Sequence, residues 1–202
     1  MVPAEILHEL EDYAARERVP ILNEGGRRVY LELLKAYRPR RVLEVGTAIG
    51  YSALLALACV ADVEILTIEL DAARAALARE NFARAGVSSR VRLLVGNAGE
   101  LLPTLAGETF DFIFLDAAKG QYPDYFRKTV PLLARGGVIV ADNVLFRGYV
   151  RSTERPPRRY RTIVKRLREY LVLTSTPPFT TEIFARGDGL ALTRRMDDDE
   201  KA

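Results

Sequence analysis

The stretch RVLEVGTAIGYSALLALACVADVEILTIEL, residues 41–70, decides the fold. Its start, residues 41–46, predicts a strand that ends in a glycine. An apolar helix is predicted over residues 51–60, and a second strand over residues 63–69. A strand, a helix and a strand in this order form a βαβ unit, in which the two strands lie parallel in one sheet.

The same alternation of strands and helices continues through the rest of the chain. The other predicted helices are 4–18, 23–37, 72–85, 123–134 and 158–171, and the other predicted strands are 91–95, 110–115, 138–141, 182–185 and 190–193. Gly136-Gly137 is expected to end the helix 123–134, and the last two strands are expected to pair as an antiparallel hairpin. We therefore predict a Rossmann-like α/β fold, a mostly parallel sheet with helices on both faces and a C-terminal antiparallel hairpin.

The composition is that of a folded domain. Of 202 residues, 49% are hydrophobic and 28% are charged. No apolar run approaches the roughly 20 residues of a membrane span, and the start of the chain does not resemble a secretory signal. We expect one domain over residues 1–196, an acidic tail at 197–202, a cytoplasmic location and no membrane partner.

Two rare residue types limit the chemistry. Cys59 is the single cysteine and His8 the single histidine. An internal disulfide and a histidine-rich zinc site are therefore excluded, and a Ser-His or Cys-His catalytic pair is disfavoured. We expect Cys59 to be a buried, inert thiol and His8 to be a surface or packing residue.

Polar residues or glycine stand at the ends of the predicted parallel strands. These are Gly46, Glu69, Asn97, Asp116 and the pair Asp142-Asn143. The carboxyl ends of parallel strands lie at one edge of a sheet, and ligands of such sheets bind beyond that edge. The pattern therefore predicts a binding site there.

The first two strand ends favour a nucleoside ligand. The loop EVGTAIGYS, residues 44–52, lacks the GxGxxG spacing that cradles a pyrophosphate, so a nucleoside without phosphates fits better than NAD. Glu69 is placed where an acid commonly binds ribose hydroxyls. Asn97 would either bind an adenine edge or cap the helix that follows it.

The other two strand ends favour a metal ion. Asp116 and Asp142-Asn143 follow strands that we expect to be adjacent, and oxygen ligands suit Mg²⁺, Ca²⁺ or Mn²⁺. The alternative is that Asp116 caps a helix and that Asp142-Asn143 forms a turn. Lys119 follows Asp116 by three positions and would serve as a general base or, alternatively, be a surface lysine.

Charge is concentrated in one segment. Residues 147–168 contain nine basic residues and one acid, a net charge of +8, which leaves −5 on the rest of a chain whose total is +3. Such a segment indicates an anionic partner or, equally, a solvated arginine-rich face. Tyr149 and Tyr160 within it would stack on a base or pack internally.

Several motifs together resemble a known family. VLEVGTAIGYSA, TIEL, FDFIFLDAAKGQY and GGVIVADNVLFRG are similar to the metal-dependent class I O-methyltransferases, which include catechol and caffeoyl-CoA O-methyltransferases. The resemblance runs from residue 21 to residue 194. It implies a seven-stranded sheet with a reversed final strand, S-adenosylmethionine as the methyl donor, and a homodimer to which the N-terminal helices, residues 1–38, contribute.

The resemblance also implies roles for individual residues. It implies that Asp116, Asp142 and Asn143 hold a divalent metal ion, which we expect to be Mg²⁺. It also implies that Lys119 is the catalytic base. The donor contacts that it implies are Leu22, Glu44, Gly46, Thr47, Ser52, Glu69, Asn97, Ala98 and Asp116. Relatives usually carry Asp where this chain has Asn97, and an Asn still accepts a hydrogen bond from the adenine amino group.

Within the family, NEGGRR, DAAKGQYPDYF, DNVLFRG and RRYRTIVKRL resemble bacterial enzymes that methylate 5-hydroxyuridine at the tRNA wobble position. The resemblance implies an anticodon loop as partner, and the basic segment and helix at 147–171 as the substrate side. The residues expected to bind tRNA are Arg158, Arg159, Arg161 and Lys165. The alternative acceptor is a small catechol or an acyl-CoA phenol. A non-catalytic RNA-binding module would not need the metal and lysine residues, and a dehydrogenase does not fit the glycine loop.

Overall fold

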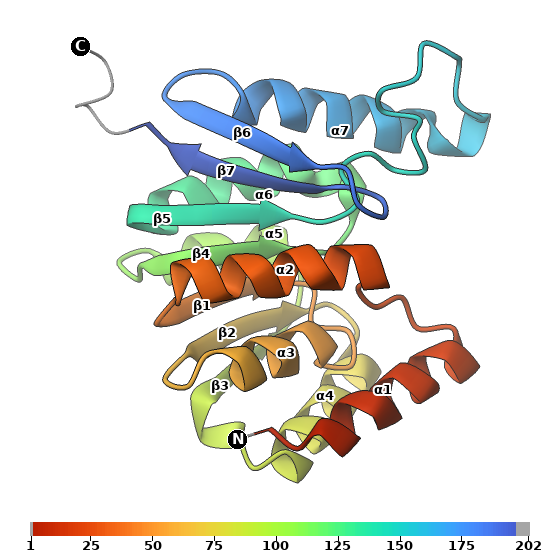
Figure 1. Cartoon of the computed structure of the whole chain (residues 1–202). Helices are drawn as coiled ribbons and strands as arrows, with labels where there is room; N and C mark the ends of the chain where they lie inside the picture. The colour runs from red at the N-terminus through yellow and green to blue at the C-terminus, as the bar shows by residue number, and fades with distance from the viewer. Residues whose placement is uncertain (1, 197–202) are drawn as a thin grey trace.

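The computed structural model describes residues 2–196, so the acidic tail expected at 197–202 lies outside the described residues. Within that range one seven-stranded sheet has the order β3-β2-β1-β4-β5-β7-β6 (Figure 1). The strands are β1 (Arg41–Val45), β2 (Glu64–Glu69), β3 (Val91–Val95), β4 (Phe110–Leu115), β5 (Leu133–Ala141), β6 (Phe179–Phe184) and β7 (Leu190–Arg195). The first five pair in parallel, whereas β7 is antiparallel to both β5 and β6. The predicted fold class and the reversed final strand are therefore confirmed.

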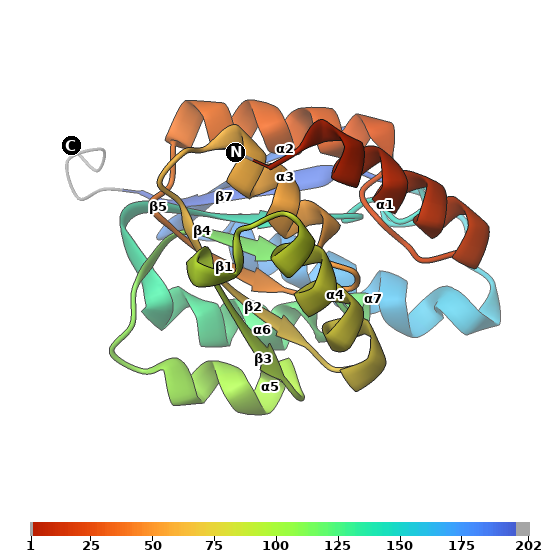
Figure 2. The same cartoon turned by 90° about the horizontal axis from the view of Figure 1, so that it is seen from below.

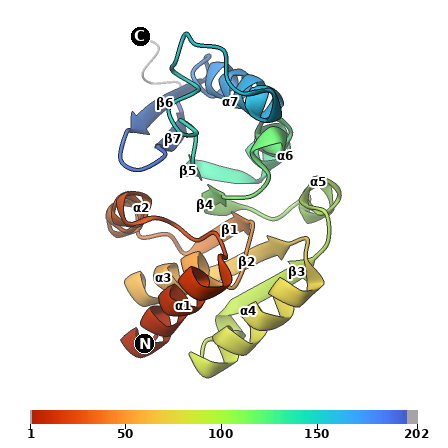
Figure 3. The same ribbon diagram turned by 90° about the vertical axis from the view of Figure 1, so that its right-hand side faces the viewer.

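Helices cover both faces of the sheet. Figure 2 and Figure 3 show four helices on one face, α1 (Ala4–Glu17), α2 (Glu24–Tyr37), α3 (Tyr51–Cys59) and α4 (Ala72–Arg84). The other face carries α5 (Ala98–Leu101), α6 (Tyr122–Thr129) and α7 (Arg161–Thr174). Side chains of a strand alternate between the two faces, so Phe112 and Phe114 enter one core layer while Ile113 and Leu115 enter the other. All four are fully buried, as a strand at the centre of such a sheet requires.

The predicted end of the helix over residues 123–134 is wrong, because the observed helix is shorter. The helix α6 ends at Thr129, a tight turn covers Val130–Leu132, and β5 begins at Leu133. Pro131 has no amide hydrogen for the helical ladder, so the helix ends there. Gly136-Gly137 lies inside β5, where the pairing of β4 with β5 shifts register. A Cβ on Gly137 would lie 3.0 Å from the carbonyl oxygens of Ala134 and Asp111.

Other element boundaries differ by smaller amounts. The strand β6 begins at Phe179, three residues before the predicted start, and the helix α7 extends to Thr174. A helix after Asn97 was expected only as one alternative, and the bounds of the short helix α5 were not predicted, because four residues carry no helical periodicity. In the described part of the chain no helix is long and apolar enough to cross a membrane.

Candidate active site

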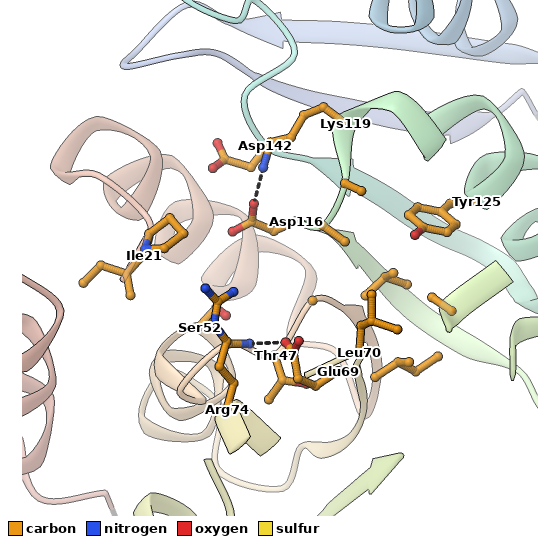
Figure 4. Close-up of a pocket in the computed structure, with 18 of the residues that line it drawn as sticks. Ile21, Thr47, Ser52, Glu69, Leu70, Arg74, Asp116, Lys119, Tyr125 and Asp142 are labelled. Carbon is orange, nitrogen blue, oxygen red and sulfur yellow. Dashed lines mark hydrogen bonds and ion pairs between the residues drawn. The ribbon is translucent and has the colours of Figure 1, made fainter. Parts of the chain in front are cut away.

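A cavity of about 350 Å³ lies at the carboxyl ends of the strands β1 to β5 (Figure 4). The structure brings together at this edge all the strand-end residues that the sequence singled out. Those that line the cavity are Gly46, Glu69, Asn97, Asp116, Asp142 and Asn143, and they are joined by Leu22, Thr47, Ser52, Ala98 and Lys119. Their roles stay predictions.

The glycine loop after β1 is forced into a close approach to β4. Gly46 has a φ of +101°, and its amide donates to the carbonyl of Ile68 at 2.9 Å. A Cβ at this position would overlap the backbone carbonyl oxygen of Asp116. Only glycine adopts this conformation and leaves room for the neighbouring strand end. The loop therefore holds the first and the fourth strand ends together.

Glu69 is oriented by the backbone around it. Its Oε2 accepts from the amide of Ala48 at 2.7 Å, and its Oε1 accepts from the amide of Asp71 at 2.9 Å. Each carboxylate oxygen can accept a second hydrogen bond, so the pair is suited to two vicinal hydroxyl groups. This geometry is what a ribose-binding acid requires.

Glu44 lies beneath the cavity rather than in its wall, and it is not among the lining residues. Its carboxylate is only 1% exposed and accepts from the hydroxyls of Ser52 at 2.5 Å and Thr67 at 2.6 Å. Burial raises the pKa of Glu44 to about 7, although the two hydroxyl hydrogen bonds lower it. Glu44 therefore fixes the orientation of Ser52, which does line the cavity.

We expect Glu44→Gln to remove a pH dependence of stability. Because the folded state raises the pKa from 4.5 to about 7, it favours the protonated carboxyl. This contribution to the free energy of unfolding is complete below pH 4.5 and is lost as the pH rises to about 7. The loss is about 3 kcal/mol, since one pKa unit corresponds to about 1.4 kcal/mol. Urea unfolding of the parent and of Glu44→Gln at the two ends of this pH range measures the loss. If the free energy of unfolding changed with pH equally in the two proteins, Glu44 would not be the group responsible.

The second half of the cavity contains two carboxylates and a lysine. Lys119 Nζ donates to Asp116 Oδ1 at 2.9 Å (Figure 4). Asp142 is 3% exposed, and among the described residues its Oδ1 has no hydrogen-bond partner. Burial raises the pKa of Asp142, as does the neighbouring Asp116, whereas Lys119 lowers it. Asn143 follows with a φ of +55°, a left-handed conformation that is uncommon outside glycine.

These residues fit a divalent cation. No group of three or more His, Cys, Asp or Glu side chains that would hold a metal occurs within residues 2–196. A site here would therefore combine the carboxylates of Asp116 and Asp142 with the amide oxygen of Asn143. Oxygen ligands of this kind suit Mg²⁺, and a buried carboxylate oxygen without a donor is stabilised by a cation.

For Asn97 the structure shows the helix-capping alternative, and the adenine-binding alternative stays a prediction. Asn97 caps α5, since its Oδ1 accepts from the amide of Gly99 at 2.9 Å, and it also lines the cavity. Arg74 and Tyr125 line the cavity too, although neither was predicted from the sequence. Arg74 follows Glu69 by five residues, and that proximity was the available signal.

The basic segment does not line the cavity but lies at the same edge of the sheet (Figure 1). Arg158, Arg159, Arg161 and Lys165 are exposed. The guanidinium of Arg159 lies 4.6 Å from the ring centroid of Tyr160. Arg168, in contrast, is used internally, because it donates to three backbone carbonyls of the loop between β5 and α7.

The tyrosines of the basic segment pack against one another. Tyr160 lies 5.3 Å from Phe146 and 5.9 Å from Tyr149, measured between ring centroids. Each of the three rings is half-buried. The packing alternative considered for Tyr149 and Tyr160 is therefore present in the structure.

Comparisons with known proteins agree on one family. A family model described as O-methyltransferase matches residues 3–196. A catechol O-methyltransferase of Mycobacterium tuberculosis is 41% identical over 135 residues, 66% of this chain and 61% of that protein. The chain thus spans less than two thirds of the length of this curated relative.

Two solved structures of methyltransferases share the fold. One is the SAH-bound methyltransferase PaMTH1 of Podospora anserina, with a TM-score of 0.85 and 29% identity, over 98% of this chain and 90% of that chain. The other is the O-methyltransferase TomG of Streptomyces achromogenes, in complex with SAM, with a TM-score of 0.84 and 27% identity, over 98% of this chain and 92% of that chain.

Proposed function

The chain belongs to the O-methyltransferase family, and from this premise we propose that it transfers a methyl group from S-adenosylmethionine to a hydroxyl group. One observation carries the proposal. The residues suited to a nucleoside, Gly46 and Glu69, line the same cavity as the carboxylate and lysine group of Asp116, Lys119 and Asp142. A donor and an acceptor bound in one cavity can be held in line for transfer.

The donor would lie across the ends of β1, β2 and β3. Glu69 would accept hydrogen bonds from the ribose hydroxyls, and Asn97 with Ala98 would face the adenine. The amino-acid end would lie beside Leu22, Thr47 and Ser52, which also line the cavity. Bound S-adenosylmethionine supplies the electrophilic methyl group.

We further propose that the reaction depends on Mg²⁺ or on another divalent cation such as Mn²⁺ or Ca²⁺. Asp116, Asp142 and Asn143 would hold the ion. A bound cation supplies charge that lowers the pKa of an acceptor hydroxyl and fixes the position of the acceptor oxygens. Lys119, 2.9 Å from Asp116, would accept the proton of that hydroxyl as the general base when it is in its neutral amine form.

For the acceptor, we propose 5-hydroxyuridine at the wobble position of tRNA. Its 5-hydroxyl and O4 are neighbouring oxygens, and an anticodon loop presents unstacked bases at low cost. The basic side chains Arg158, Arg159, Arg161 and Lys165 are exposed, and the segment that carries them lies at the carboxyl-end edge of the sheet (Figure 1). They would contact the phosphates on either side of the target nucleotide.

A small catechol is the second candidate acceptor. It is favoured by the catechol O-methyltransferase that matches this chain at 41% identity. It also offers two neighbouring oxygens and needs no phosphate contact. The two acceptors therefore differ in their dependence on the basic segment.

Reversing the charge of Arg158, Arg159 and Arg161 to Glu separates the two acceptors. We expect kcat/KM for tRNA to fall by at least about tenfold, because phosphate contacts dominate nucleic-acid affinity, and kcat/KM for catechol to change by less than about twofold. The measurement is transfer of labelled methyl groups to tRNA that contains 5-hydroxyuridine and, separately, to catechol, each at two salt concentrations.

A matched control variant reverses the same amount of charge elsewhere. Lys35, Arg38 and Arg40 are exposed at the opposite edge of the sheet, and their reversal should leave both activities unchanged. Equal losses for tRNA in the two triple variants would refute a phosphate-binding role of the basic segment. Transfer to catechol alone would make the second candidate the correct one.

A further inference from the structure

Arg74 is the one basic side chain lining the cavity that forms no ion pair within residues 2–196. The other base in the wall, Lys119, is hydrogen-bonded to Asp116 at 2.9 Å. None of the ion pairs within residues 2–196 includes Arg74. Its backbone amide donates to Asp71 Oδ1 at 3.1 Å, and its guanidinium acts on Asp71 through charge without forming an ion pair. A guanidinium exposed in a ligand cavity without an ion pair is available to an anionic group of the ligand.

The position of Arg74 restricts which group that is. Arg74 lies in the first turn of α4, which follows β2 and Glu69 directly. Figure 4 shows its side chain on the wall that carries Thr47 and Ser52, whereas Tyr125 lies across the cavity. The nearby acid Glu69 is held by two backbone amides and is suited to hydroxyl groups. The wall around Arg74 is thus the part of the cavity assigned above to the amino-acid end of the donor.

We propose that Arg74 binds the carboxylate of the amino-acid end of S-adenosylmethionine. This inference rests on the proposed function, since it concerns the same donor. The donor carries a single carboxylate, and the acids in the wall, Glu69, Asp116 and Asp142, would repel it. Arg74 provides the complementary charge, so it contributes to donor affinity and to discrimination against adenosine compounds that lack the carboxylate.

The test compares two ligands that differ in the amino-acid end. S-adenosylhomocysteine carries the carboxylate, and 5′-methylthioadenosine lacks the whole amino-acid end but keeps adenine and ribose. Calorimetric titration of the parent protein and of Arg74→Gln measures the affinity of each protein for both ligands. We expect Arg74→Gln to lower the affinity for S-adenosylhomocysteine by about tenfold, because a charge-assisted hydrogen bond has about this effect. The affinity for 5′-methylthioadenosine should stay within about twofold of that of the parent. The tenfold difference should shrink as salt is added.

Arg79 supplies the matched control. It lies on the same helix, is exposed and does not line the cavity. Arg79→Gln removes the same charge and should leave both affinities unchanged. Unchanged binding of S-adenosylhomocysteine to Arg74→Gln, or equal weakening of both ligands, would overturn the inference. A parent protein that binds neither ligand would instead refute the proposed function itself.

Discussion

Replacing Asp142 with Asn is expected to lower kcat for methyl transfer by at least about a hundredfold, while S-adenosylhomocysteine binds within about threefold of its affinity for the parent. The carboxylate of Asp142 is 3% exposed, and within the described residues its Oδ1 has no donor. Under the proposed function such a group would contribute a negative ligand to the cation and little to donor binding, which is assigned to Glu69 and the glycine loop. Methyl-transfer rates at saturating donor and calorimetric titration of S-adenosylhomocysteine measure the two effects separately.

The same variant tests the dependence on metal. The parent should lose activity in EDTA and regain it with Mg²⁺, and Mn²⁺ bound to the parent should give a spectroscopic signal that Asp142→Asn lacks. The variant should not melt at a lower temperature than the parent without metal, because Asn removes a buried charge whose pKa burial has raised. Asp124→Asn, in α6 outside the cavity, is the control for loss of an acid. Full activity of Asp142→Asn in EDTA would rule out metal activation.

The part of the site that was predictable from sequence follows from topology. Apolar runs that end in Gly46, Glu69, Asp116 and Asp142 predict parallel strands, and the carboxyl ends of parallel strands must lie at one edge. The grouping of these side chains therefore needs no knowledge of side-chain packing. The central strand β4 was predicted with its observed bounds, because its residues are apolar on both faces.

The rest depends on contacts that no local pattern contains. Glu44 lies beneath Ser52 because α3 packs on the sheet. Gly136-Gly137 has the sequence signature of a helix end but serves the register shift between β4 and β5. Arg74 resembles any exposed arginine on a helix until the wall of the cavity is seen. In each case tertiary packing decides between two local readings that the sequence permits equally.

Gly46→Ala is expected to have the second large effect, a loss of about 3 kcal/mol in the free energy of unfolding together with loss of donor binding. A Cβ on Gly46 would overlap the carbonyl oxygen of Asp116 and would lie 2.8 Å from its carbonyl carbon. The loop cannot move away without breaking the 2.9 Å hydrogen bond from the Gly46 amide to Ile68. Any relief would displace Asp116, on which the proposed metal and base both depend.

Gly107 separates this close approach from backbone strain alone. Its φ of +94° resembles the +101° of Gly46, but nothing lies within 4 Å of a Cβ placed on it. Gly107→Ala should therefore cost only about 1 kcal/mol, the penalty of the left-handed conformation, and should bind S-adenosylhomocysteine like the parent. Urea unfolding and calorimetric titration of the two variants measure the difference. Equal stability of Gly46→Ala and Gly107→Ala would show that the ends of β1 and β4 do not constrain each other, and the geometry that joins the donor half of the cavity to its carboxylate half would lose its support.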